Sequence, residues 1–131
     1  MNKKRFILAV IAVLVFVFLY EFLVNNFLFA DLYRQTAELW RPEDQYSMGY
    51  VFLAQFFFVV MLAFIFTRNY EAKGIGEGVR FGVMFGLLLG LPKIALYAYM
   101  DIPMVLVLGW VVAEFVKALG AGIVLSLTYK K

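Results

Sequence analysis

The chain has 131 residues, of which 65% are hydrophobic, 19% aromatic and 16% charged, and its net charge is +3. A soluble domain is about 45–50% apolar, so this composition would leave aggregation-prone apolar surface in water. The chain contains no Cys and no His, which excludes disulfides, thiolate nucleophiles, imidazole-ligated haem and the usual zinc sites. We therefore expect an integral membrane protein forming one domain over residues 1–131, with no cofactor and no metal.

Four apolar runs are each long enough to cross a membrane as a helix. A hydrocarbon core about 30 Å thick requires about 20 apolar residues. The runs that meet this length cover about residues 6–24, 48–66, 79–100 and 102–127. A tight turn between the last two runs would make those helices antiparallel neighbours. The sequence therefore predicts the all-α fold class and, more closely, an integral membrane four-helix bundle.

The first run admits a second interpretation as a secretory signal peptide. Lys3, Lys4 and Arg5 precede it, as in the basic n-region of such a signal. However, the apolar run exceeds the about 7–15 residues of a usual signal. The candidate cleavage site, at residues 28–30, is also weak. We favour a retained first helix over a cleaved one.

The connection between the first two runs has helical spacing. One face of a helix would carry Leu32, Thr36, Leu39 and Trp40, which lie at i, i+4, i+7 and i+8. This spacing predicts a short interfacial amphipathic helix in the first outer loop. Tyr33, Trp40 and Arg41 would then lie at the level of the lipid headgroups. The segment is interpreted as a surface anchor or, alternatively, as a lid over the outer mouth of the bundle.

Residues 39–43 of this loop read Leu-Trp-Arg-Pro-Glu, with Leu32-Tyr33 and Thr36-Ala37 before them. The segment resembles one that follows the first span of short bacterial four-span inner-membrane proteins of unknown function. The resemblance covers the first span and the outer loop best. It implies an inner-membrane location and carries no activity that could be transferred.

Lysine and arginine are distributed unequally between the two sides of the predicted bundle. Eight lie on the side of the termini, namely Lys3, Lys4, Arg5, Arg68, Lys73, Arg80, Lys130 and Lys131. Only Arg34 and Arg41 lie on the other side. Because basic residues collect in cytoplasmic loops, we expect a multi-pass protein of the bacterial inner (cytoplasmic) membrane with both termini in the cytoplasm.

Glycine recurs along the third run at a strict spacing of four residues, at positions 74, 78, 82, 86 and 90. Small residues at this spacing let two helix backbones approach closely in lipid. We therefore expect a glycine zipper in which Gly78, Gly82, Gly86 and Gly90 form a packing face. This face would lie against the fourth helix or, alternatively, against a second copy in a homodimer.

Polar and ionisable residues interrupt the apolar runs at similar depths. At about 1.5 Å of rise per residue, one slab from mid-membrane toward the outer half would contain Glu21, Gln55, Lys93, Glu114 and Lys117. The two Glu and the two Lys sum to zero charge. Each of the four helices contributes at least one member, so we expect these residues to meet inside the bundle.

The third run contributes two further features beside Lys93. Tyr97 lies four residues after Lys93, on the same helix face, and completes the candidate binding site. Pro92 lacks a backbone N–H and is expected to kink the helix. Interrupted helices near the middle of a membrane are typical of binding sites in transporters.

Two interpretations of the charge cluster remain open. It is a neutral network that fixes the register of the helices, or a site where Glu21 or Glu114 binds a proton or a cationic solute. We predict small-solute or ion binding or transport, coupled to protons. The alternative is a non-catalytic accessory, assembly or scaffold subunit of a membrane complex.

Catalysis is not expected, because no nucleophile–base pair and no metal-ligand spacing is evident. The predicted partners are the lipid bilayer and either a second copy of the chain or another membrane protein. We expect no nucleic-acid partner, because the net charge is explained by orientation in the membrane.

Overall fold

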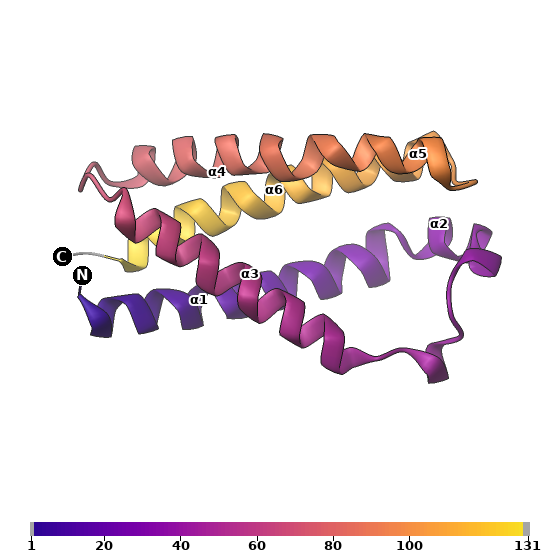
Figure 1. The fold of residues 1–131 in the computed structure, drawn as a ribbon, viewed down its shortest axis with the longest axis horizontal. Coiled ribbons are helices and arrows are strands. Elements are labelled where there is room, and N and C mark those ends of the chain that lie inside the picture. Colours follow the sequence, from indigo (N-terminus) through magenta and orange to yellow (C-terminus); the bar gives the residue numbers. More distant parts are fainter. Residues whose placement is uncertain (1, 130–131) are drawn as a thin grey trace.

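The computed structural model describes residues 2–129 and is an all-α bundle (Figure 1). Its long helices are α1 (Lys3–Leu23), α3 (Met48–Arg68), α4 (Ile75–Gly90) and α6 (Met104–Thr128). With the turns that continue them, the stretches long and apolar enough to cross a membrane are Lys3–Leu28, Met48–Arg68, Ile75–Tyr99 and Met104–Thr128. The predicted fold class is confirmed, and the protein is a multi-pass membrane protein.

The two ends of the bundle differ in what they contain. Figure 1 places both chain termini and the α3–α4 connection at one end, which we call the terminal end. The α2 segment and the α5–α6 turn lie at the opposite end, which we call the distal end. At the terminal end the backbone N–H of Asn2 donates to the hydroxyl of Tyr129 at 3.4 Å. Helices α1 and α6 are thereby joined where the described chain begins and ends.

A π-helical turn over Val24–Leu28 continues α1 toward the distal end. The backbone N–H of Phe29 donates to the carbonyl of Val24, five residues earlier, at 3.0 Å. The chain then forms α2 (Ala30–Gln35) and two 3₁₀ turns, Ala37–Leu39 and Glu43–Gln45. The first membrane-crossing stretch is therefore longer than predicted and ends in a wider turn.

The helix predicted over residues 32–40 is interrupted at Thr36. This residue has φ −117° and ψ 27°, outside the α-helical region. Its side-chain hydroxyl donates to the carbonyl of Leu32 at 3.0 Å. Threonine competes in this way with the regular backbone hydrogen bonds of a helix. The outer loop is therefore a short α-helix followed by a tighter turn.

Helix α4 begins at Ile75, four residues before the predicted start, and Glu77 in its first turn holds the loop that precedes it. The Glu77 carboxylate accepts hydrogen bonds from the backbone N–H groups of Glu71, at 2.7 Å, and Lys73, at 3.0 Å. Gly74 precedes the helix with φ +75°, a conformation that glycine adopts without strain. Glu77 is buried and serves this connection at the terminal end.

Pro92 tightens the end of α4. The helix passes at Gly90 into a 3₁₀ turn, Leu91–Ala95, and then into the short helix α5 (Leu96–Tyr99). Proline removes one backbone donor and disfavours a regular α-helix around it. The expected kink is thus a tighter helical stretch, and it carries Lys93 toward α6.

Helices α4 and α6 approach each other closely along the glycine face. A Cβ atom added to Gly82 would lie 2.6 Å from the Cα of Leu119, and one on Gly90 would lie 3.0 Å from the carbonyl oxygen of Val111. Gly78 faces Gly122, and Gly86 faces Phe115. Of the two arrangements considered above, the structure places the glycine face against α6.

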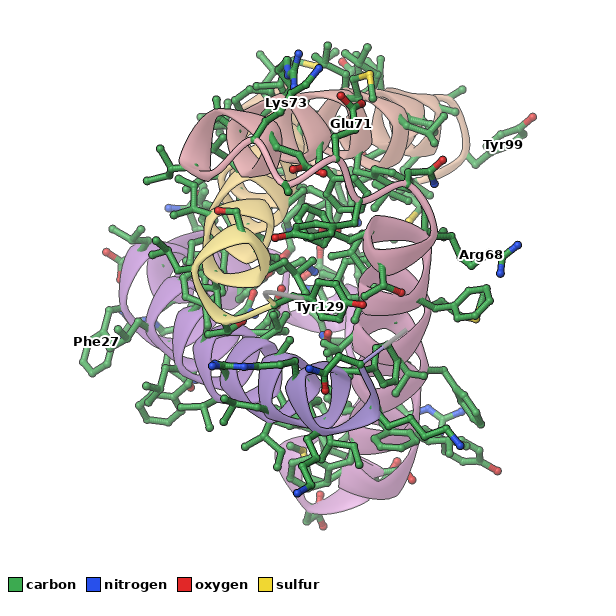
Figure 2. The ribbon with its side chains drawn as sticks, turned by 90° about the vertical axis from the view of Figure 1, so that its left-hand side faces the viewer. Phe27, Arg68, Glu71, Lys73, Tyr99 and Tyr129 are labelled. Atoms are coloured by element: carbon green, nitrogen blue, oxygen red, sulfur yellow. The ribbon has the colours of Figure 1, made fainter. Side chains whose placement is uncertain are left out.

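The core of the terminal half is filled by valine, leucine and aromatic side chains. Val13 and Val17 of α1 pack with Val59 of α3 and Leu125 of α6. Figure 2 shows Tyr129 directed into the centre of the bundle, whereas the labelled Phe27, Arg68 and Tyr99 point outward. The Tyr129 ring lies 6.5 Å from Phe66 and 5.1 Å from Tyr70, centroid to centroid. The terminal end is therefore packed with aromatic rings.

Candidate functional site

Lys117 of α6 forms the centre of an ion-pair network. Its ammonium lies 2.9 Å from Glu21 of α1 and 3.1 Å from Glu114, one turn earlier on α6. It also lies 4.9 Å from the centre of the Phe58 ring of α3, within cation–π distance. The Lys117 side chain is only 7% exposed. An ammonium so deeply buried is stable only because each of these groups compensates its charge.

Lys93 joins the network more loosely. Its ammonium lies 3.9 Å from Glu114, at the limit of an ion pair. The Lys93 side chain is 36% exposed, against 15% for Glu114. Glu114 is thus shared between a close buried lysine and a distant, more exposed one. Of these contacts, the one between Lys93 and Glu114 is the easiest to exchange.

A chain of hydrogen bonds connects Glu21 to the segment that covers it. The Asn25 amide donates to the Glu21 carboxylate at 3.0 Å. The Tyr33 hydroxyl donates to the Asn25 side-chain carbonyl at 2.7 Å and accepts from the indole N–H of Trp110 at 3.0 Å. Burial raises the pKa of Tyr33 above its ordinary value. Tyr33 is therefore a neutral phenol at neutral pH, able to donate and accept at once.

Trp40 closes this segment over α6. Its indole N–H donates to the hydroxyl of Thr36 at 2.9 Å, and Thr36 is buried. The Trp40 ring meets Tyr33 at 5.5 Å and Trp110 at 6.1 Å, both edge to face. Tyr33 and Trp40 thus turn toward the bundle, and we call residues 30–40 the lid. Arg41 is exposed.

A pocket of about 370 Å³ lies between this lid and the ion-pair network. Its charged lining residues are Glu21, Lys93 and Glu114, and its aromatic ones are Tyr20, Phe29, Tyr33, Trp40 and Trp110. The remaining lining residues are Val24, Asn25, Leu96, Met100 and Ala113. Binding sites for small molecules have this character, with apolar or aromatic walls and a few convergent polar groups.

Four of the six predicted binding residues come together, and two lie elsewhere. Glu21, Lys93, Glu114 and Lys117 form the network described above. Gln55 of α3 and Tyr97 of α5 are not among the residues that line the pocket, and Tyr97 is exposed. Helix α3 contributes the Phe58 ring to the network instead of the Gln55 amide.

Several residues of the site were not singled out from the sequence. Tyr20 donates to the carbonyl of Ala113 at 2.6 Å and joins α1 to α6 beside the pocket. Asn25, one turn after Glu21, was a detectable signal, since a polar residue at i+4 can reach a buried carboxylate. The position of Phe58 had no such signal among the many Phe residues of the chain.

Removal of the Tyr33 hydroxyl tests whether its two hydrogen bonds hold the lid against the bundle. Tyr33→Phe removes the donor to Asn25 and the acceptor for Trp110, so we expect a loss of about 1–2 kcal/mol in the free energy of unfolding. Acrylamide should quench tryptophan fluorescence more strongly in this variant. Tyr99→Phe, at a position that is 87% exposed, is the matched control. Equal quenching of the two variants would contradict the role assigned to Tyr33.

Comparison with protein-family models, with curated proteins and with solved structures finds no match to this chain. The resemblance of residues 39–43, with Leu32-Tyr33 and Thr36-Ala37 before them, therefore stays a prediction from the sequence. Within residues 2–129, no group of three or more acidic side chains is placed to hold a metal ion. The pocket and its charged lining residues are the features of the chain that point to a function.

Proposed function

We propose that this membrane protein binds a small polar solute in the distal pocket and carries it across the membrane. The observation that carries the proposal is the pocket of about 370 Å³, into which Glu21, Lys93 and Glu114 all project. Ionisable residues inside membrane spans are costly and mark solute or ion pathways by default. A purely structural network has no need of an adjoining cavity.

We further propose that the protein resides in a bacterial inner membrane with both termini in the cytoplasm. The unequal distribution of lysine and arginine supports this orientation, since basic loops remain in the cytoplasm. In this orientation the pocket faces the outside. The aromatic packing around Tyr129 then faces the cytoplasm.

Proton coupling would act through Glu114. A proton on this carboxylate removes the charge that holds Lys93 at 3.9 Å and Lys117 at 3.1 Å. Lys117 keeps its closer pair with Glu21, at 2.9 Å, so α1 and α6 stay connected. Lys93 would then be free to move toward the outer interface, as long basic side chains near helix ends do.

Uptake into proteoliposomes tests this proposal. Four membrane-impermeant solutes cover the charge types: choline, β-alanine, gluconate and sorbitol. We expect protein-dependent uptake of at least one of them, driven by a pH gradient, and a loss of at least tenfold with Glu114→Gln. Glu38→Gln, at an exposed position in the outer loop, is the matched control and should transport normally.

The opposite result would favour the alternative function. If none of the four solutes enters, and none alters the tryptophan fluorescence of the protein, the proposal of solute transport is wrong. An accessory or scaffold role in a membrane complex then becomes the better hypothesis. Gentle extraction from native membranes should in that case recover a defined partner.

A further inference from the structure

The charges around the pocket differ in how firmly they are held. Glu21 and Glu114 both contact Lys117 at about 3 Å, on the buried side of the pocket. Lys93 contacts Glu114 only at 3.9 Å and is partly exposed. A ligand can therefore enter between Lys93 and Glu114 without breaking the two close pairs of Lys117.

Electrical neutrality restricts what can enter there. The formal charges of the two Glu and two Lys of the network sum to zero, and apart from Asn25 the other residues that line the pocket are aromatic or apolar. A ligand with a single charge would leave that charge uncompensated in a medium of low dielectric constant, which is costly. A ligand with one positive and one negative group adds no net charge. Its two groups would replace one long ion pair by two short ones.

The walls of the pocket fit the positive group of such a ligand. Tyr33, Trp40 and Trp110 line the pocket together, and the Trp40 ring meets each of the other two edge to face. Aromatic faces attract ammonium groups. Glu114 supplies the carboxylate and Lys93 the ammonium for the two ends of the ligand.

We infer that the solute is a small zwitterion, with its ammonium bound by Glu114 and its acidic group bound by Lys93. This inference rests on the proposed function. The same chemistry occurs in free amino acids and in the ethanolamine headgroup of phospholipids. Both carry an ammonium a few bonds from an anionic group, and the experiment below separates them.

Tryptophan fluorescence gives a direct measure of occupancy, because both tryptophans of the chain line the pocket. The protein is reconstituted in vesicles of phosphatidylglycerol, which has no ammonium. It is then titrated with β-alanine, propylammonium and propionate, which share a three-carbon chain and differ in charge. We expect β-alanine to change the emission saturably, with an affinity about tenfold to a hundredfold higher than either analogue.

A second type of vesicle shows whether the bound zwitterion is a free solute or a lipid headgroup. It is an equal mixture of phosphatidylglycerol and phosphatidylethanolamine. If the mixture itself changes the emission and abolishes the β-alanine response, the zwitterion is a lipid headgroup. If the response is unchanged, the zwitterion is a free solute. Tighter binding of propylammonium or propionate would overturn this inference and leave the proposed function standing. No response to any probe or to the mixture would overturn both.

The variant Lys93→Gln tests whether Lys93 binds the acidic group of the zwitterion. This variant should bind β-alanine about tenfold or more weakly. Propylammonium should bind at least as tightly as it does to the wild type, because it now compensates the charge left on Glu114. The close pairs of Lys117 remain, and circular dichroism verifies that the variant keeps its helices. Lys73→Gln, an exposed lysine at the terminal end, is the matched control. If Lys93→Gln binds β-alanine like the wild type, the assignment of the two ends is wrong.

Discussion

Replacement of Lys117 by methionine is expected to destabilise the protein by about 3–5 kcal/mol, because it leaves two partly buried carboxylates without their shared partner. Glu21 would lose its ion pair at 2.9 Å and Glu114 its pair at 3.1 Å. Methionine retains most of the side-chain volume, so the loss arises from charge rather than from a cavity. Unfolding by denaturant in mixed micelles, followed by circular dichroism, measures the change.

Two further variants separate charge from packing in this experiment. Lys93→Met removes only the 3.9 Å contact of a side chain that is 36% exposed, so its cost should stay below about 1 kcal/mol. Combining Lys117→Met with Glu21→Gln and Glu114→Gln removes the unpaired charges and should recover most of the stability. If Lys117→Met were as stable as Lys93→Met, Lys117 would not be the centre of the network.

The second large effect is expected at Gly82. An alanine Cβ there would lie 2.6 Å from the Cα of Leu119 and 2.8 Å from the carbonyl oxygen of Ala118. Both are backbone atoms, so α4 and α6 must separate to accept it. Overpacking of this kind costs about 1–3 kcal/mol. The same unfolding assay should therefore show a clear decrease for Gly82→Ala.

Gly76 provides the control for Gly82 in the same helix. A Cβ at Gly76 would have no neighbour within 4 Å. Because alanine favours a helix over glycine, Gly76→Ala should stabilise the protein by up to about 1 kcal/mol. The two substitutions therefore have opposite expected signs. Equal effects at both positions would show that the close approach of α4 and α6 does not limit stability.

The helices and their order could be predicted from the sequence because lipid imposes a simple requirement. A helix must carry about 20 apolar residues to cross the membrane, and length and hydropathy suffice to find it. The first and last residues of the helices were predicted less accurately, since they depend on local contacts of the backbone. Helix α4 begins before the predicted start, next to a loop whose Glu71 and Lys73 N–H groups donate to the Glu77 carboxylate. Hydropathy contains no information about such a contact.

The sequence predicted how deep in the membrane the candidate residues lie. It predicted only in part the directions in which their side chains point. Depth follows from the rise of a helix, and it brought Glu21, Lys93, Glu114 and Lys117 to one level. Rotation about the helix axis requires a polar face, and α3 is apolar on all sides around Gln55. Its rotation is therefore decided by packing, which directs Phe58 to Lys117.

The π-helical turn at Val24–Leu28 has a consequence for the rotational phase of the chain. Tyr20, Val24, Phe29 and Tyr33 all line the pocket, at successive spacings of four, five and four residues. In an unbroken α-helix each residue turns by about 100°, so Phe29, nine residues after Tyr20, would lie about 180° away from it. The hydrogen bond from Phe29 back to Val24 absorbs one extra residue. The side chains that line the pocket thus form one continuous face from the membrane span into the lid. The one extra residue of the π-helical turn keeps the two parts of this face aligned.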